Sequence, residues 1–206
     1  MMKILVVTGG IGSGKSEVCS IISKVFSCGV YEADRRVKSL YDIHPSLLSD
    51  IECLLGCSLR GEDGNFKPAC LAERIFSDRD ALEAVEALVF PALMEDFGRW
   101  SRDHDSDRFV VFESATILEK PQFEGFADKV IVVDAPFQVR LERACRRDGL
   151  SEDAVRSRMI NQVLMNRMSE GIIPDGVDAV IMNDGDMDDL HKQTVMAVNE
   201  LFGINL

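Results

Sequence analysis

Short apolar runs alternate with longer stretches of helical periodicity through the first and last parts of the chain. The apolar runs predict buried strands, which are expected at 3–8, 30–32, 109–112, 130–133 and 179–182. The helical stretches predict helices at 15–26, from 34, at 136–147, from 151 and at 186–202. Strands that alternate with helices are typical of an α/β fold built on a parallel sheet.

The middle of the chain breaks this alternation, because residues 45–105 show only helical patterns. Helices are expected at 45–55, 68–76 and 79–102. Pro91 is expected to kink or divide the last of these, since proline donates no backbone hydrogen bond. We therefore expect a core formed by 1–44 and 106–206, with a helical domain inserted at 45–105.

Composition and charge narrow the function classes. The 206 residues include 35 acidic and 23 basic side chains, a formal net charge of −12 that argues against a diffuse nucleic-acid binder. No stretch approaches the roughly 18 apolar residues of a membrane span. The apolar run at 4–7 leads into glycines and not into a signal-peptide cleavage site, so we expect a cytoplasmic protein. We expect it to be a monomer or a small homo-oligomer. The six cysteines form no C-x-x-C pair, which favours reduced thiols over a zinc site.

The residues that carry chemistry begin directly after the first predicted strand. Gly-Gly-Ile-Gly-Ser-Gly-Lys-Ser at 9–16 satisfies the pattern G-x-x-x-x-G-K-[ST] between a strand and a helix. Glycines let backbone N–H groups turn inward around a phosphate, and the positive end of the following helix adds to the attraction. Lys15 would reach the β- and γ-phosphates, and the Ser16 hydroxyl would bind Mg²⁺. The residues expected to bind ATP are Gly10, Ile11, Gly12, Ser13, Gly14, Lys15, Ser16 and Glu17.

The motif predicts a nucleoside triphosphate with Mg²⁺, and the alternative is a glycine-rich turn without a ligand. It leaves open whether the phosphoryl group goes to water or to another molecule. Asp34, just after the second predicted strand, would accept the proton of a substrate hydroxyl, or would cap the helix that follows. Glu32 is a weaker candidate on the same stretch. Glu113, at the end of the third predicted strand, would contact Mg²⁺ through water or cap the next turn.

Arginines gather on one side of the helix predicted at 136–147. Arg140, Arg143 and Arg147 are spaced i, i+3, i+7 and share a face, and Arg158 and Gln162 are spaced i, i+4 on the following helix. Two such helices suit a lid that closes over phosphates, because arginine spreads phosphate charge well. The alternative is a solvated face in which these arginines pair with Glu142, Asp148 or Glu152.

With these residues placed, the chain resembles the dephospho-coenzyme A kinase family over nearly its whole length. The segment 8–16 has the form that this family uses, and the family's Asp-Ala-Asp appears as Glu32-Ala33-Asp34. The family's Arg-Asp-Gly-Leu-Ser lies at 147–151, and its Val-Ile-x-Asn-x-Gly at 180–185. Its Leu-x-x-x-x-Phe-x-Asp segment matches Leu71, Phe76 and Asp78.

The resemblance implies ATP-dependent phosphorylation of the ribose 3′-hydroxyl of dephospho-coenzyme A, the last step of coenzyme A synthesis. It implies a P-loop, nucleoside-monophosphate-kinase-like α/β/α core of three layers with a central five-stranded parallel sheet. A helical acceptor-substrate domain and a helical lid at about 140–170 would complete the fold.

By the same resemblance, Asp34 is the catalytic base, Lys15 clamps the phosphates and Ser16 binds Mg²⁺. Arg147 would touch the transferring phosphate. Arg143 would flank the adenine, which Asn183, Asp184 and Gly185 would border. Further substrate or lid residues are expected to be Glu32, Arg140, Arg158, Gln162, Phe90 and Glu113.

Three positions depart from the family pattern, and all are outside the nucleotide half. Phe90-Pro91 stands where the family usually has His-Pro, Pro68 stands where it usually has Arg, and 113–119 replaces an Asp-x-Pro-Leu-Leu-x-Glu segment. Two alternatives therefore stay open. One is a kinase of a nucleoside monophosphate or another small hydroxyl compound, and the other is a nucleotide-dependent switch without kinase activity.

Overall fold

The protein consists of two compact units that alternate along the chain. The structure, a computed structural model, describes residues 2–204. One unit, here called the core unit, contains the chain up to Glu32 and from His104 onward, and the other, the helical unit, is Ala33–Asp103. The helical unit thus begins at Ala33 and not at 45, the start expected for the insertion.

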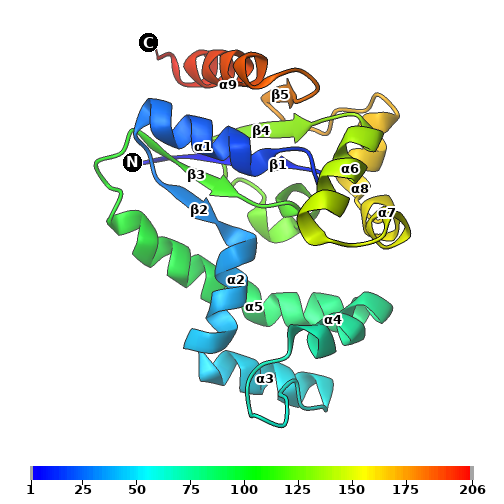
Figure 1. The fold of residues 1–206 in the computed structure, drawn as a ribbon. Coiled ribbons are helices and arrows are strands. Elements are labelled where there is room, and N and C mark those ends of the chain that lie inside the picture. The colour runs from blue at the N-terminus through cyan, green and yellow to red at the C-terminus, as the bar shows by residue number, and fades with distance from the viewer. Residues whose placement is uncertain (1, 205–206) are drawn as a thin grey trace. The chain divides into compact units, whose positions relative to one another are not determined.

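A five-stranded parallel sheet forms the centre of the core unit (Figure 1). Its order is β2-β3-β1-β4-β5, which confirms the predicted α/β fold. Val7 and Glu32 both pair with Glu113, so the carboxyl ends of β2 and β3 lie level with Val7, and β1 continues two residues further, to Gly9. The strands are β1 (Lys3–Gly9), β2 (Val30–Glu32), β3 (Phe109–Glu113), β4 (Lys129–Asp134) and β5 (Ala179–Met182).

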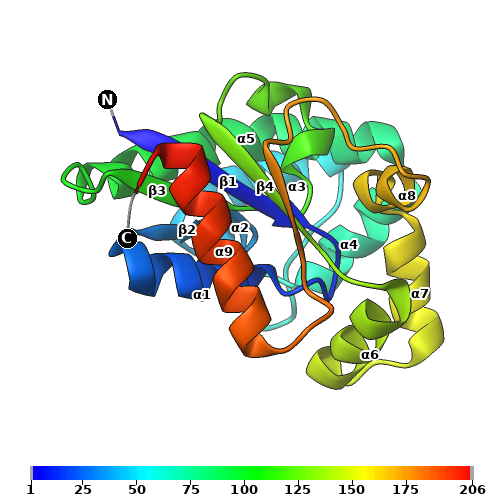
Figure 2. The same cartoon turned by 90° about the horizontal axis from the view of Figure 1, so that it is seen from above.

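Two helices lie side by side over one face of this sheet, as Figures 1 and 2 both show: α1 (Lys15–Phe26) and α9 (Met187–Phe202). The face buries one alternate set of strand residues, because neighbouring side chains in a strand point to opposite sides. Leu5, Val7 and Ile131 pack here with the apolar sides of both helices. This burial fixes α1 over the sheet, and α1 begins where the glycine-rich loop ends.

The opposite face carries a cluster of aromatic rings. Phe112 stacks on Tyr31 with ring centroids 5.3 Å apart, and it meets Phe126 edge-on at 5.0 Å. Phe123 and Phe126 come from a segment with two 3₁₀ turns, η1 (Ile117–Glu119) and η2 (Pro121–Phe123). These turns are too short for a helical pattern to reveal them, so they were not predicted from the sequence.

Three helices lie beyond the carboxyl ends of the strands: α6 (Phe137–Asp148), α7 (Glu152–Ile160) and α8 (Val163–Ser169) (Figures 1 and 2). The start of α7 is as predicted, since the Ser151 hydroxyl accepts a hydrogen bond from the Ala154 N–H at 3.4 Å. Gly149, with a φ of +65°, ends α6 in a left-handed conformation that glycine adopts without strain. The separate helix α8 was not predicted.

The helical unit contains α2 (Ala33–Ile43), α3 (Pro45–Leu55), α4 (Pro68–Ser77) and α5 (Arg79–Arg102). Each of the first three packs against α5. Because α2 packs on α3 and α5, it belongs to this unit and not to the core, where it was expected.

Helix α5 runs through Pro91 as one helix, so the predicted division there is wrong, and the predicted kink stays a prediction. Proline removes one backbone hydrogen bond. Val85 and Val89 before it and Leu93 and Phe97 after it are all buried, and this packing holds both halves in one helix. Among residues 2–204, no helix is both long and apolar enough to cross a membrane.

Candidate active site

The glycine-rich loop joins the central strand β1 to helix α1, in the place that the sequence predicted. Gly14 precedes the first residue of α1 with a φ of +99°, and its carbonyl accepts the N–H groups of Glu17 at 3.0 Å and Val18 at 3.2 Å. A side chain is disfavoured at this φ. A Cβ on Gly14 would also run into the amide of Asn183. The loop therefore needs glycine here for both its conformation and its packing.

Lys15 folds back over this loop. Its Nζ donates to the carbonyls of Gly9 at 3.0 Å and Gly10 at 3.2 Å. The carboxylate of Glu113 lies 3.9 Å from the same Nζ, and both side chains are largely buried. The structure thus brings two predicted site residues together, and Glu113 contacts the lysine of the loop.

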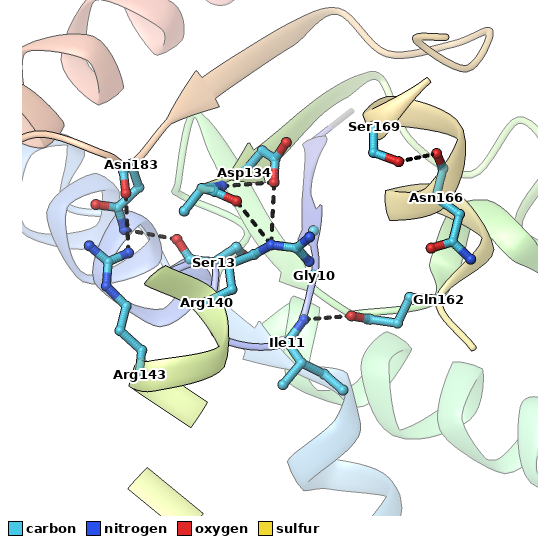
Figure 3. A network of polar contacts seen from close by, with 12 residues as sticks. Gly10, Ile11, Ser13, Asp134, Arg140, Arg143, Gln162, Asn166, Ser169 and Asn183 are labelled. Atoms are coloured by element: carbon cyan, nitrogen blue, oxygen red, sulfur yellow. Dashed lines mark hydrogen bonds and ion pairs between the residues drawn. The ribbon is translucent and has the colours of Figure 1, made fainter. Parts of the chain in front are cut away.

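Two side chains from distant parts of the chain hold the loop's backbone (Figure 3). The Oε1 atom of Gln162 accepts the N–H of Ile11 at 2.9 Å. The Nδ2 atom of Asn183, which is buried, donates to the carbonyl of Ser13 at 2.8 Å. The N–H of Ile11, one of the predicted ATP-binding residues, is therefore bound by Gln162.

Arg143 is fixed on the same network. Its Nη1 donates to the Asn183 carbonyl at 3.1 Å, so it touches the segment after β5 (Figure 3). The sequence resemblance placed Arg143 and Asn183 around one ligand group, and the structure brings these two residues into direct contact. Asp184 and Gly185 follow in the turn before α9.

Arg140 is buried, although it was expected among the lid residues that face a ligand. Only 7% of its side chain is exposed. Its Nε donates to the Ala135 carbonyl at 2.9 Å and lies 3.7 Å from Asp134 Oδ1. Its Nη1 packs against Gly10 and has no hydrogen-bond partner in the described part of the chain. Burial lowers the pKa of Arg140, and the Asp134 charge opposes that shift.

Arg147 and Arg158 lie at the outer end of α6 and on α7, and both pair with Asp148. Arg147 Nε and Nη2 donate to the two carboxylate oxygens at 2.7 and 3.0 Å, and Arg158 Nη1 donates at 3.3 Å. These hydrogen bonds lower the pKa of Asp148 and raise that of Arg147. Arg147 is 62% and Arg158 50% exposed, so both guanidinium groups remain open to solvent.

Carboxylate side chains lie at the carboxyl ends of the neighbouring strands β2 and β3. Glu32 and Glu113 are register partners at the carboxyl ends of β2 and β3. Asp34 follows as the second residue of α2, in its first turn, so it does not cap a helix starting at residue 35 as the alternative supposed. Asp34 and Phe90, which is half-buried in α5, belong to the helical unit.

The cysteines are free thiols. Cys19 on α1 is buried near Glu113, and burial together with that carboxylate raises the pKa of its thiol. Burial also raises the pKa of Cys28 to about 12. A thiol with a raised pKa is a weak nucleophile, which assigns Cys19 and Cys28 to packing and not to chemistry.

The residues at hand suit Mg²⁺ bound with a nucleotide. Within residues 2–204 no group of three or more His, Cys, Asp or Glu side chains could hold a metal ion. Mg²⁺ keeps several waters and is usually bound by one or two protein oxygens together with phosphate oxygens. Ser16, exposed in the first turn of α1 directly after Lys15, can supply such an oxygen.

Two acidic residues that organise the site were not predicted from the sequence. Asp134 ends β4 and contacts Arg140, and Glu119 Oε1 accepts the Leu164 N–H at 3.1 Å, tying η1 to α8. The sequence does contain one pattern that could have identified Asp134 as a site residue, because Asp134 directly follows an apolar run, as Glu113 does. No local pattern marks Glu119, since its partner is far along the chain.

The fold and this loop together define a class of protein. A phosphate-binding loop follows the central strand of a parallel sheet in the order β2-β3-β1-β4-β5, and arginine-bearing helices lie beyond the strand ends. This is the arrangement of a P-loop kinase.

The particular family follows from comparison with known proteins. The sequence profile of the dephospho-CoA kinase family matches residues 3–189. A dephospho-CoA kinase from Porphyromonas gingivalis is 38% identical over 86% of this chain and 84% of its own length. One from Chlorobaculum tepidum is 32% identical over 96% and 94% of the two chains. The chain belongs to the dephospho-CoA kinase family, the kinases of the final step of coenzyme A synthesis.

Solved structures show the same fold. A Thermus thermophilus crystal structure is 26% identical and superimposes with a TM-score of 0.81 over 97% of both chains. The dephospho-CoA kinase from Campylobacter jejuni, at 22% identity, has a TM-score of 0.55 over 97% of both chains and shares the fold.

Proposed function

We propose that this chain transfers the γ-phosphoryl group of ATP to the ribose 3′-hydroxyl of dephospho-coenzyme A. The observation that carries the proposal is the phosphate loop, held by Lys15, Gln162 and Asn183 within a chain of this family. In the reaction the 3′-oxygen forms a bond to the γ-phosphorus, the bond to ADP breaks, and the hydroxyl proton leaves to a base.

The loop would bind the triphosphate through its backbone. Gly12 and Gly14 have positive φ angles of +75° and +99°, a geometry that lets successive N–H groups line a concave anion site. The N-terminus of α1 adds its partial positive charge. Lys15 is already at the loop, and its ammonium would move from the Gly9 and Gly10 carbonyls to phosphate oxygens.

Mg²⁺ would neutralise charge on the phosphate oxygens when bound with ATP. In this chain Ser16 would hold it through the hydroxyl, and Glu113 and Glu32 would act through water at the adjoining strand ends. Arg143 would flank the adenine, bordered by Asn183, Asp184 and Gly185. Arg147 would leave Asp148 for the transferring phosphate, since an exposed side chain reorients at little cost.

We further propose which part of the chain binds each substrate. The core unit binds ATP, with 140–170 as its lid, and the helical unit binds the acceptor. Asp34, in the first turn of α2, is the general base that accepts the proton of the 3′-hydroxyl.

The test is an assay of the purified protein with ATP, Mg²⁺ and dephospho-coenzyme A, with ADP and coenzyme A measured as products. Asp34→Asn should lose about 10²- to 10⁴-fold in kcat while ATP affinity is kept, as expected for a general base. Asp42→Asn is the matched control, since it changes an exposed Asp on the same helix. Equal turnover by the two variants would remove Asp34 from this role.

The choice of acceptor needs its own arm of the assay. Nucleoside monophosphates and other small hydroxyl compounds are tested beside dephospho-coenzyme A under the same conditions. A higher kcat/KM for one of them would reassign the substrate. ADP release that is independent of every acceptor would instead point to a nucleotide switch.

A further inference from the structure

The Asn183 side chain makes a contact that a role beside the adenine does not explain. Its Nδ2 donates to the Ser13 carbonyl at 2.8 Å, and only 7% of the residue is exposed. Gly14 leaves room for this approach, because a Cβ there would collide with the same Nδ2 atom. The glycine of the loop and the asparagine after β5 therefore fit each other.

Asn183 is itself fixed from two sides. Its N–H donates to the Asp134 carbonyl at 2.7 Å, which continues the pairing of β5 with β4. Its carbonyl accepts Arg143 Nη1 at 3.1 Å (Figure 3). A donor held by two further hydrogen bonds presents its amide in one direction, so it can impose an orientation on the Ser13 carbonyl.

The contact between Asn183 and the Ser13 carbonyl also fixes the direction of the Gly14 N–H, because the two groups belong to one peptide unit. The peptide bond is planar and trans, so the carbonyl of one residue and the N–H of the following one point in opposite directions. No described peptide bond is cis. With the Ser13 carbonyl held toward Asn183, the N–H of Gly14 points away from Asn183. That N–H has no hydrogen-bond acceptor among residues 2–204.

The Gly10–Ile11 peptide, earlier in the same loop, has the reverse arrangement. The Gly10 carbonyl accepts Lys15 Nζ and the Ser13 N–H, while the Ile11 N–H donates to Gln162. The N–H groups of the Gly10–Ile11 and Ser13–Gly14 peptides thus differ in their hydrogen bonding. The Ile11 amide is bound by Gln162, the residue before α8, whereas the Gly14 amide points away from Asn183 and is free to donate to a ligand.

We infer that Asn183 is a positioning residue for phosphate binding: its side-chain amide sets the Ser13–Gly14 peptide plane so that the Gly14 N–H donates to a nucleotide phosphate. The inference rests on the proposed function, because it requires the loop to bind ATP. It assigns the Asn183 side chain to the phosphate end of the nucleotide.

The experiment separates the two ends of the nucleotide. Affinities for ADP and for adenosine are measured by calorimetry or by displacement of a fluorescent ADP analogue. Asn183→Asp keeps the shape but places an oxygen against the Ser13 carbonyl, and Asn183→Ala removes the contact. In both variants ADP affinity should fall about 10- to 100-fold, the scale of one lost buried hydrogen bond and one misdirected donor, while adenosine affinity changes less than about threefold.

Gln193→Ala is the matched control. Gln193 holds the N–H and the carbonyl of Met182, the residue before Asn183, at 3.2 and 3.0 Å, but it does not touch the loop. Its loss should leave the ratio of ADP to adenosine affinity unchanged. Parallel loss of both affinities in the Asn183 variants would overturn the inference in favour of a base contact, and no loss of either would overturn it as well.

A measurement on the unaltered protein guards against variants that fail to fold. The Gly14 amide resonance should move downfield on addition of ADP and not on addition of adenosine, and an unmoved resonance would contradict the inference. Failure of the proposed function looks different, since the unaltered protein would then bind no ADP or form no coenzyme A.

Discussion

The two ends of helix α6 carry arginines of the same helical face in opposite environments. Arg140, in the first turn, is 7% exposed, contacts Asp134 and packs against Gly10 of the loop. Arg147, two turns later, is 62% exposed and pairs with Asp148 beside Arg158. The inner arginine is part of the core that shapes the loop, and the outer one is available to move. Helical spacing alone treats the two as equivalent.

The largest difference between the two ends of α6 is expected in catalysis, where only Arg147 should contribute to kcat. Arg147→Ala should lower kcat by about 10³-fold, because an arginine that stabilises a transferring phosphate contributes at least that much. The melting temperature should stay near that of the unaltered protein, since the side chain is exposed. Arg146→Ala changes the adjacent exposed arginine and is the control. If both variants turn over alike, the outer end has no catalytic role.

Replacing Arg140, at the inner end of α6, should lower the free energy of unfolding. Arg140→Met removes one partner of a buried ion pair, a change that costs about 3–5 kcal/mol in general, and the partial exposure of Asp134 argues for the lower end, about 3 kcal/mol. Urea unfolding measures it. A free energy of unfolding within about 0.5 kcal/mol of the original, the range of an ordinary surface change, would show that Arg140 is not an internal support.

Gln162 joins the lid helices to the loop, and its removal should loosen that link. Gln162→Ala leaves the Ile11 N–H without its acceptor, and amide exchange at Ile11 should accelerate about tenfold, the equivalent of one modest hydrogen bond. Gln162→Glu retains the accepting oxygen and should restore the protection. Unchanged exchange in the alanine variant would mean that the contact does not hold the loop in solution.

The smallest effect is expected from Asp148. Its pKa is lowered by Arg147 and Arg158, so its pairing stabilises the fold above the ordinary aspartate value of 3.8 and is lost as the pH falls through the lowered pKa. Asp148→Asn should therefore cost less than about 1 kcal/mol at pH 7, as surface ion pairs do. The difference from the unaltered protein should disappear in acid. Melting curves from pH 7 to about pH 2 test this, and a difference that persists in acid would exclude the ion pairs as its source.

Local patterns predicted most of the fold and the centre of the site. The apolar runs located all five strands, and the spacing of Gly9, Gly14, Lys15 and Ser16 located the loop. These features depend on neighbouring residues, so a short window of sequence contains them. The division of the helix that was the alternative to a kink at Pro91 does not occur, because packing along α5 outweighs one missing backbone hydrogen bond.

The supports of the loop could not be predicted in this way. The contacts of Ile11 with Gln162 and of Ser13 with Asn183 join residues that are 151 and 170 positions apart. Spacing placed Arg140 and Arg147 on one face but could not give their depth, which depends on Ala135, Asp134 and Gly10. The roles of Asp34 and Phe90 in binding an acceptor stay predictions.

The burial of Cys19 has a consequence for an enzyme of this family, because coenzyme A and its precursor each end in a sulfhydryl. Disulfide exchange needs a thiolate that can reach a sulfur atom. Cys19 lies on α1 in the core with only 4% of its surface exposed, and its raised pKa keeps it protonated. A thiol cofactor that is itself readily oxidised therefore finds no reactive partner in Cys19 and does not become covalently attached through it.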